Sequence, residues 1–451
     1  DTVTLGAGAS QSGFGRTGTV DWQTTPKTAD FTGVNGEGYF INSAGGAVIV
    51  TLPGSPSAGN VVAVSDYNST AATNAITIAR NGSNINGSAT NLLIENANAA
   101  VQLVYVDATT GWQSVITANT SDISSNFIEA TGGTITTSPC GDYKIHTFTG
   151  PGTFTVSSAG NPIGSTTLEY LVVAAGGGGG GDCTGTGGGG GGAGGFRFAS
   201  PSLTPATYPA KPLAAPAGIT AAVQSYPVTV AAGGGAAGPA TSPGGNGSNS
   251  VFGPITSTGG GGGSSAGGPN GPSNTGQNGG SGGGAQYYNA PAKGSGNTPP
   301  VSPSQGNDGG ASVNPSNRYG SGGGGGALAV GVTTTACSAG GNGGVGGGFP
   351  EIFSGSNGQS SGGFRYFSGG GGGGVWSNVP IPMYPAQAVG SGGLGGGANA
   401  GALAGRDTPS PGNSATVNTG GGGGGATGGN PGTSTGGAGG SGIVIIRYKF
   451  Q

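Results

Sequence analysis

The apolar residues in the first quarter of the chain form short β-branched and aromatic runs separated by turn residues. Such runs are typical of strands, and they occur at residues 39–41, 47–52, 61–65, 76–79, 92–94 and 101–106. Two Asn-Gly dipeptides, at residues 81–82 and 86–87, favour tight hairpin turns. We therefore predict a small all-β module over residues 31–116, preceded by a connecting arm over residues 1–30.

A second set of strands follows a linker that we predict over residues 117–126. Within residues 127–175, two segments that alternate with a period of two are joined by a Gly-Pro-Gly turn. A closing strand is predicted over residues 443–451. We expect the strand that ends at Val173 to pair with the strand that begins at Ile443, so that the connectors between them gather at the opposite end.

Between residues 176 and 442 the pattern gives way to glycine runs. Of the 112 glycines in the chain, 22 precede Ala175, which leaves 90 for the remainder. Runs of five or six begin at Gly176, Gly187, Gly259, Gly322, Gly369 and Gly420, with shorter runs at Gly233, Gly282, Gly346 and Gly395. A triple helix of the collagen type is excluded, because it requires glycine at every third position throughout.

A flexible linker is a second interpretation of this region, but a spacer does not need the apolar and aromatic groups that interrupt the runs. The third interpretation is a polyglycine II bundle. Its left-handed strands have three residues per turn and no internal hydrogen bonds, so amides and carbonyls point outward in three directions. Side-by-side packing satisfies them, and a side chain inside a run would push the strands apart. We predict all-β N-terminal modules, a polyglycine II domain over residues 176–442 and essentially no α-helix.

Composition and charge exclude several functions. Only 6% of residues are charged and the net charge is −3, so no basic patch is available for nucleic acid. No apolar stretch is long enough for a membrane helix, and we expect no membrane insertion. Cys140, Cys183 and Cys337 are widely spaced, which favours small buried thiols over a disulfide framework. Met383 is the only methionine, so we expect either that an N-terminal leader or a larger part was removed, or that this is a portion of a longer polypeptide.

The flanking segments and the glycine runs together resemble a known family. These segments are 169–175 before six glycines, 194–197, 226–230 and 441–448. The chain is similar to the glycine-rich domain of bacteriophage virion fibre proteins, notably those of cyanobacterial phages, and to polyglycine II sandwich tail-fibre adhesins. The resemblance implies β-modules that are trimeric in fibres, and loops at the distal end of the bundle that touch a host receptor.

Residues for catalysis are scarce. His146 is the only histidine, and it lies in an alternating segment, where we expect a packed or partly exposed strand residue. Glycine motifs such as G-x-G-x-x-G are inevitable in these runs and carry no weight outside a βαβ unit. The aspartates of the glycine region, such as Asp308, do not recur as a calcium-binding repeat requires. We predict a protein that is not an enzyme and that uses no cofactor and no metal.

Aromatic residues between the glycine runs are the candidates for recognition. Tyrosine, tryptophan and arginine on a rigid support give large contact areas at low entropic cost. The tentative receptor-binding residues are Tyr287, Tyr288, Arg318, Tyr319, Trp376 and Tyr384. An equally weighted alternative is that the inserted aromatics cap or shield the bundle, and we favour that role for Phe196 and Phe364.

The resemblance thus implies a phage virion fibre or tail adhesin, and we expect it to attach to a host surface glycan or outer-membrane protein. Its expected partners are copies of itself, as a homotrimer, and other virion proteins on the N-terminal side. It would be located on the virion. The alternatives are a purely structural head, collar or tail decoration, or an extracellular filament or matrix protein of a cell.

Overall fold

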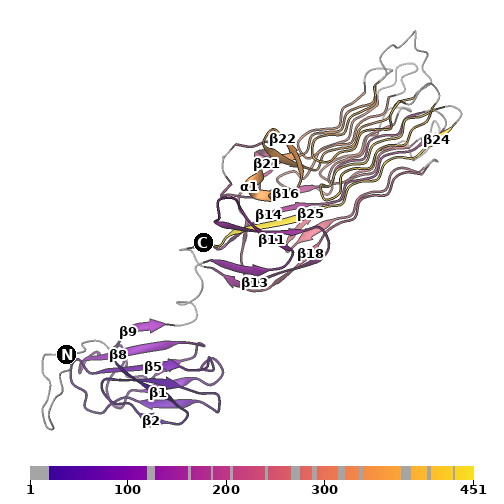
Figure 1. Cartoon of the computed structure of the whole chain (residues 1–451). Coiled ribbons are helices and arrows are strands. Elements are labelled where there is room, and N and C mark those ends of the chain that lie inside the picture. Colours follow the sequence, from indigo (N-terminus) through magenta and orange to yellow (C-terminus); the bar gives the residue numbers. More distant parts are fainter. Residues whose placement is uncertain are drawn as a thin grey trace, which may run out of the picture. The chain divides into compact units, whose positions relative to one another are not determined.

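The computed structural model places the chain in two compact units, residues 1–124 and residues 125–451 (Figure 1). Each unit is described by itself. For residues 116–118 and 183 only the backbone is described. The structure describes residues 20–118, 127–160, 164–183, 186–203, 207–238, 242–265, 275–286, 292–312, 320–334, 339–376, 388–403, 408–429 and 432–451.

The N-terminal unit consists of two sheets that enclose one apolar core. One sheet has the order β1 (Asp21–Lys27), β3 (Glu37–Ile41), β5 (Val61–Asp66), β8 (Ala100–Asp107) and β9 (Gly111–Ala118). The other has the order β2 (Phe31–Thr32), β4 (Val48–Thr51), β6 (Ile76–Ala79) and β7 (Leu92–Ile94). Ile41, Val50, Ile76 and Trp112 are buried between them, which confirms an all-β module.

The first strands of this unit pair in parallel, since the chain alternates between the two sheets as it coils. β1 pairs with β3 and β3 with β5 in one sheet, while β2 pairs with β4 and β4 with β6 in the other. Residues 21–27 form a strand of this sheet, in which Trp22 pairs with Gly38 and stacks on Phe40. The predicted connecting arm over residues 1–30 is therefore wrong for residues 21–27. The predicted turn at residues 86–87 does form a two-residue hairpin, with both residues at positive φ.

A two-sheet sandwich forms the base of the C-terminal unit. Its first sheet has the order β11 (Thr134–Thr137), β12 (Tyr143–Phe148), β25 (Ile443–Lys449), β14 (Thr167–Val173) and β16 (Phe196–Ala199), and β17 (Ile219–Thr220) also pairs with β14. The second has the order β10 (Ile128–Thr131), β13 (Gly152–Ala159), β18 (Ser225–Thr229), β19 (Ser250–Phe252) and β20 (Ile255–Ser257). As expected, β14 and β25 pair antiparallel, with Val173 opposite Ile443.

Both faces of the central strands of the first sheet are buried, whereas its edge strand β11 is exposed. Alternate residues of β14, such as Leu168 and Val172, face the second sheet, and Leu171 and Val173 face an aromatic cluster on the other side. That cluster contains Phe196, Phe198, Phe349, Phe353 and Phe367, all fully buried. Three of them come from β21 (Gly347–Pro350), α1 (Glu351–Ser354) and β23 (Phe364–Phe367). These elements lie, together with β22 (Gln359–Ser361), at the base and not at the opposite end.

The connectors therefore divide between the two ends of the bundle, which corrects the expectation that they gather at one. Phe196 and the half-buried Phe364 belong to the aromatic cluster at the base, as the capping interpretation predicts. Among the residues described, the helical elements are α1 and a short 3-10 turn, Lys211–Leu213, so the all-β prediction is confirmed.

The glycine runs form a bundle of polyglycine II strands around one central strand, residues 187–195. Every third amide of this strand donates to the same neighbour, and Gly188, Gly191 and Gly194 each bond to strand 420–428 at 2.8 Å. The other amides donate to strands 258–265 and 320–326, and the carbonyls accept from strands 174–181, 281–286 and 369–376. The central strand is thus bonded in every direction, with donating and accepting neighbours in alternation.

The longest glycine runs are the innermost strands. The run that begins at Gly187 is central, and all the other runs of five or six lie in the surrounding ring. A Cβ built on Gly190 would lie 2.9 Å from the Gly324 nitrogen and closer still to the Gly371 carbonyl. The prediction that a side chain inside a run would push the strands apart is therefore confirmed for these positions.

Outer strands tolerate side chains at the positions that face away from the bundle. In strand 231–238, Ala231, Gly234 and Ala237 are buried, and the residues between them are exposed or half-buried. This period of three follows from the three residues per turn of a polyglycine II strand. Runs of five or six glycines therefore mark inner strands, whereas a run of three occurs both in the outer strand 231–238 and in the inner strand 281–286.

Candidate functional site

The distal end of the bundle, marked in Figure 1 by β24 (Thr433–Ser434), lies away from the base, and β15 (Asp182–Cys183) pairs with β24 there. The predicted residues Tyr287, Tyr288, Arg318, Tyr319 and Tyr384 lie outside the described residues. Trp376 is described, and it is half-buried, with its backbone bridged to Gly428. The structure therefore describes one of the six tentative contact residues, and the recognition role of the set stays a prediction.

Short polar side chains complete the backbone bonds of the strands that reach this distal end. Ser265 Oγ accepts from the Gly181 amide at 2.7 Å, and Ser321 Oγ donates to the Gly187 carbonyl at 2.6 Å. Both serines are fully buried. Because a buried backbone group without a partner is costly, these bonds keep the strand ends ordered up to the distal end.

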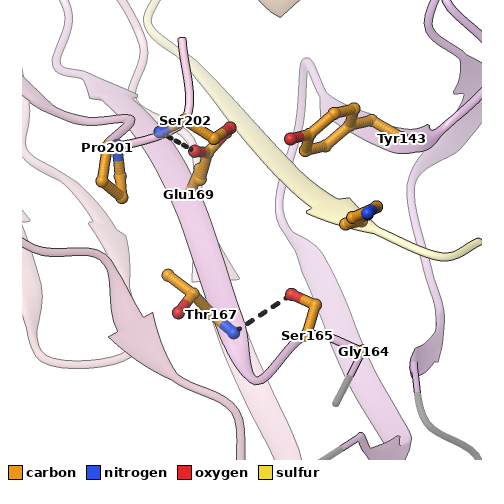
Figure 2. A pocket seen from close by; sticks show the side chains of 8 residues that line it. Tyr143, Gly164, Ser165, Thr167, Glu169, Pro201 and Ser202 are labelled. Carbon is orange, nitrogen blue, oxygen red and sulfur yellow. Dashed lines mark hydrogen bonds between the residues drawn. The ribbon is translucent and has the colours of Figure 1, made fainter. Parts of the chain in front are cut away.

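A second candidate site is a pocket of about 330 Å³ in the base, whose largely apolar wall carries several polar groups (Figure 2). It lies beside β14 and β25 and is lined by Tyr143, Gly164, Ser165, Thr167, Glu169, Pro201, Ser202 and Lys449. Figure 2 shows the Tyr143 hydroxyl directed toward Glu169 and Ser202, with Thr167 and Ser165 farther along the same pocket. Its lining thus combines a carboxylate, a lysine and several hydroxyls.

Glu169 is held in this pocket by a buried ion pair. Arg447 Nε lies 3.0 Å from Glu169 Oε2, and the two side chains are 2% and 3% exposed. The Ser202 amide donates to Glu169 Oε1 at 3.0 Å, and Arg447 Nη2 donates to Ser202 Oγ at the same distance. The Arg447 guanidinium also lies over the Tyr143 ring, 3.9 Å from its centre. These contacts fix the carboxylate in one orientation.

Sequence reasoning missed this pair, although the sequence contains a signal for it. Glu169 is the only charge in β14, and Arg447 directly follows four apolar residues in β25. The register of the two strands places Glu169 and Arg447 opposite each other. A charge buried in an apolar strand requires a partner of opposite sign. Matching the two strands would therefore have predicted the ion pair.

His146 is fully buried in β12, which confirms the expectation of a packed strand residue. Its Nδ1 donates to the Gly132 carbonyl at 2.7 Å, so Nε2 accepts from the Tyr448 hydroxyl at 3.1 Å. Burial lowers the pKa of His146. The hydrogen bond to the Gly132 carbonyl raises this pKa, and the charge of Lys144 lowers it further. Because burial disfavours the charged form of either group, it raises the pKa of Tyr448, to about 12. The imidazole is therefore neutral at pH 7.

Cys140 is exposed in a turn, which corrects the expectation that it is buried. Ser138, its hydrogen-bond partner, lowers the pKa of its thiol. The Cys183 side chain and all of Cys337 lie outside what the structure describes. Within the described ranges, no helix is both long and apolar enough to cross a bilayer.

Comparison with known protein families gives a match for the glycine-rich region and its base. The model of a family described as a glycine-rich domain matches residues 146–449, from β12 through the bundle to β25. No curated protein matches the chain. The matched segment covers more than half of the chain and coincides with the base and the glycine strands, so this chain belongs to the glycine-rich domain family.

Proposed function

We propose that the chain is a non-enzymatic bacteriophage virion protein, a fibre or tail adhesin that attaches the particle to a host cell. The N-terminal module assembles as a homotrimer and joins other virion proteins. The glycine bundle carries the distal end outward, where it contacts a surface glycan or an outer-membrane protein. Many weak contacts, multiplied by the number of copies, give stable adsorption.

The observation that carries this proposal is the fully bonded interior of the bundle. The central strand makes backbone bonds to six surrounding strands, and buried serines complete the bonds at the distal end. A lattice of this kind supplies a stiff support without a large apolar core. The sequence segments that follow Gln286 and Trp376 contain the tyrosines expected for recognition.

Adsorption of the assembled particle to its host tests this function. Changing Tyr287, Tyr288 and Tyr384 together to alanine should reduce the adsorption rate at least tenfold. The matched control is Tyr67→Ala, which removes a tyrosine that is 56% exposed in the N-terminal module. Unchanged adsorption of the triple variant would instead favour a purely structural decoration.

The assembly itself distinguishes the remaining alternative. A purified assembly that contains a capsid and DNA supports a virion protein, and an assembly without them favours a cellular filament or matrix protein. Sedimentation of the isolated chain tests the homotrimer. A stable monomer at micromolar concentration would remove trimerisation from the proposal.

A further inference from the structure

The pocket beside β14 and β25 is lined by more polar groups than the ion pair between Glu169 and Arg447 uses. Glu169 lines it although it is 3% exposed, and its orientation is fixed by Arg447 and by the Ser202 amide. A carboxylate has about four acceptor positions, and these two contacts use one on each oxygen. Glu169 therefore retains acceptor capacity next to the pocket.

The remaining lining groups supply donors and groups that both donate and accept. Lys449 is a donor only, whereas the hydroxyls of Tyr143, Ser165 and Thr167 act in either role. Ser202 Oγ already accepts from Arg447, which leaves its own hydrogen available as a donor. Pro201 and the Tyr143 ring add apolar surface. The pocket thus offers acceptors and donors around a partly apolar wall.

We propose that this pocket binds one sugar residue, through ring hydroxyls that donate to Glu169 and accept from Lys449 and Ser202. A hydroxyl group both donates and accepts, so a polyhydroxylated ring matches both kinds of lining group at once. The C–H faces of such a ring match Pro201 and Tyr143. A volume of about 330 Å³ lies at the small end of ligand pockets and suits a single ring with one substituent.

Other ligand classes fit less well. A metal ion would be repelled by Arg447 and Lys449, and the described residues contain no group of three His, Cys, Asp or Glu side chains placed to hold one. A zwitterionic amino acid would need a free carboxylate for its ammonium group, but Arg447 already neutralises Glu169. An apolar ligand would leave the buried carboxylate without a further partner.

This site is distinct from the distal end and does not depend on the proposed attachment function. It lies in the sandwich, beside the ends of β14 and β25 that are farther from the glycine bundle. Sugar binding here would therefore persist in a chain that plays no part in adsorption, and adsorption would persist in a chain whose pocket is blocked.

Saturation-transfer NMR on the full chain tests the proposal. The probes are the methyl glycosides of glucose, galactose, N-acetylglucosamine and glucuronic acid, with serine as the zwitterion probe. We expect transfer to at least one glycoside and none to serine. No transfer to any glycoside, or transfer to serine alone, would overturn the proposal.

Two variants link the signal to the pocket. Thr167→Val combined with Lys449→Met removes a hydroxyl and a charge without opening the buried ion pair, and it should weaken glycoside binding at least tenfold. The matched control is Thr416→Val, in a separate polar cleft on the flank of the bundle. Equal binding by the double variant and the wild-type chain would place the sugar elsewhere and refute the assignment.

Discussion

Gly190 and Gly235 show why glycine is needed at some positions of the bundle and not at others. Neither residue has a positive φ, so conformational freedom is not the reason for glycine at either position. Gly190 is surrounded by backbone in the centre of the bundle, whereas a Cβ on Gly235 would meet no atom within 4 Å. The requirement at Gly190 is therefore space for neighbouring strands.

Replacing each of these glycines by alanine separates the two cases. Gly190→Ala should destabilise the C-terminal unit by about 3 kcal/mol or more, because the new methyl group forces backbone apart. Gly235→Ala should stabilise it by about 0.4–1 kcal/mol, because alanine lowers the entropy of the unfolded chain. Urea unfolding of both variants measures the difference. Equal effects would mean that the strands are not packed as described.

Asparagines at the edge of the bundle replace backbone bonds that an additional strand would make. Asn246 Oδ1 accepts from the Gly262 amide at 2.8 Å, and Asn342 Oδ1 accepts from the Ser391 amide at 2.9 Å. Asn399 Oδ1 does the same for the Gly392 amide. Side-chain carbonyls in these positions finish the lattice at its surface, where exposed backbone would otherwise invite pairing with other chains.

Asn342 permits a direct test of this role. Asn342→Ala should lower the free energy of unfolding by about 1 kcal/mol, because the Ser391 amide loses its acceptor. Asn342→Asp keeps an oxygen in the same place and serves as the matched control, with a smaller loss. If both variants unfold at the urea concentration of the wild-type chain, the side-chain bond contributes nothing.

At the scale of elements, the contact between β12 and β25 predicts a pH dependence. His146 is the only histidine in the chain, and burial lowers its pKa below the value of about 6.5 in an unfolded chain. The unfolded state therefore binds the proton more readily, and stability is lost as the pH falls below about 6.5. The groups around His146 include the neutral Tyr448 hydroxyl, the Gly132 carbonyl and the charge of Lys144.

Thermal unfolding between pH 7.5 and pH 5 measures this dependence. The melting temperature of the C-terminal unit should fall over this range in the wild-type chain. His146→Gln removes the titrating group and should flatten the profile, even if it lowers stability at every pH. A wild-type profile that is already flat would contradict a lowered pKa for His146.

The elements that the sequence predicted well are those whose pattern has a single physical meaning. Runs of five or six glycines fit only strands without room for a Cβ, and these runs are indeed innermost. Parallel pairing of β1, β3 and β5 was not predictable in the same way, because period-two alternation does not report strand direction. The sugar pocket was missed because its residues come from segments far apart in the sequence.

At the scale of the whole C-terminal unit, the last strand of the chain completes a sheet that the first strands of the unit begin. β25 lies between β12 and β14, and strand 436–440 bonds to the first glycine run at Gly176 and Gly179. Strand 420–428 contacts both that run and the central strand. The glycine strands gain few local contacts, so their order depends on distant partners and on the sandwich, whose β14 and β25 hold the two ends of the glycine region.

Amide hydrogen exchange tests this dependence across the whole unit. Amides of residues 188–195 donate to strands on several sides and should exchange only when the unit unfolds, at the rate of the amides shared by β14 and β25. In strand 231–238, slow amide exchange should instead recur at every third residue. Gly234 and Ala237 donate to the first glycine run, whereas the exposed Gly235 and Ala236 amides have no partner among the described residues. Uniformly fast exchange across both strands would mean that the glycine region is a flexible tether, and a stiff support for attachment would then be lost.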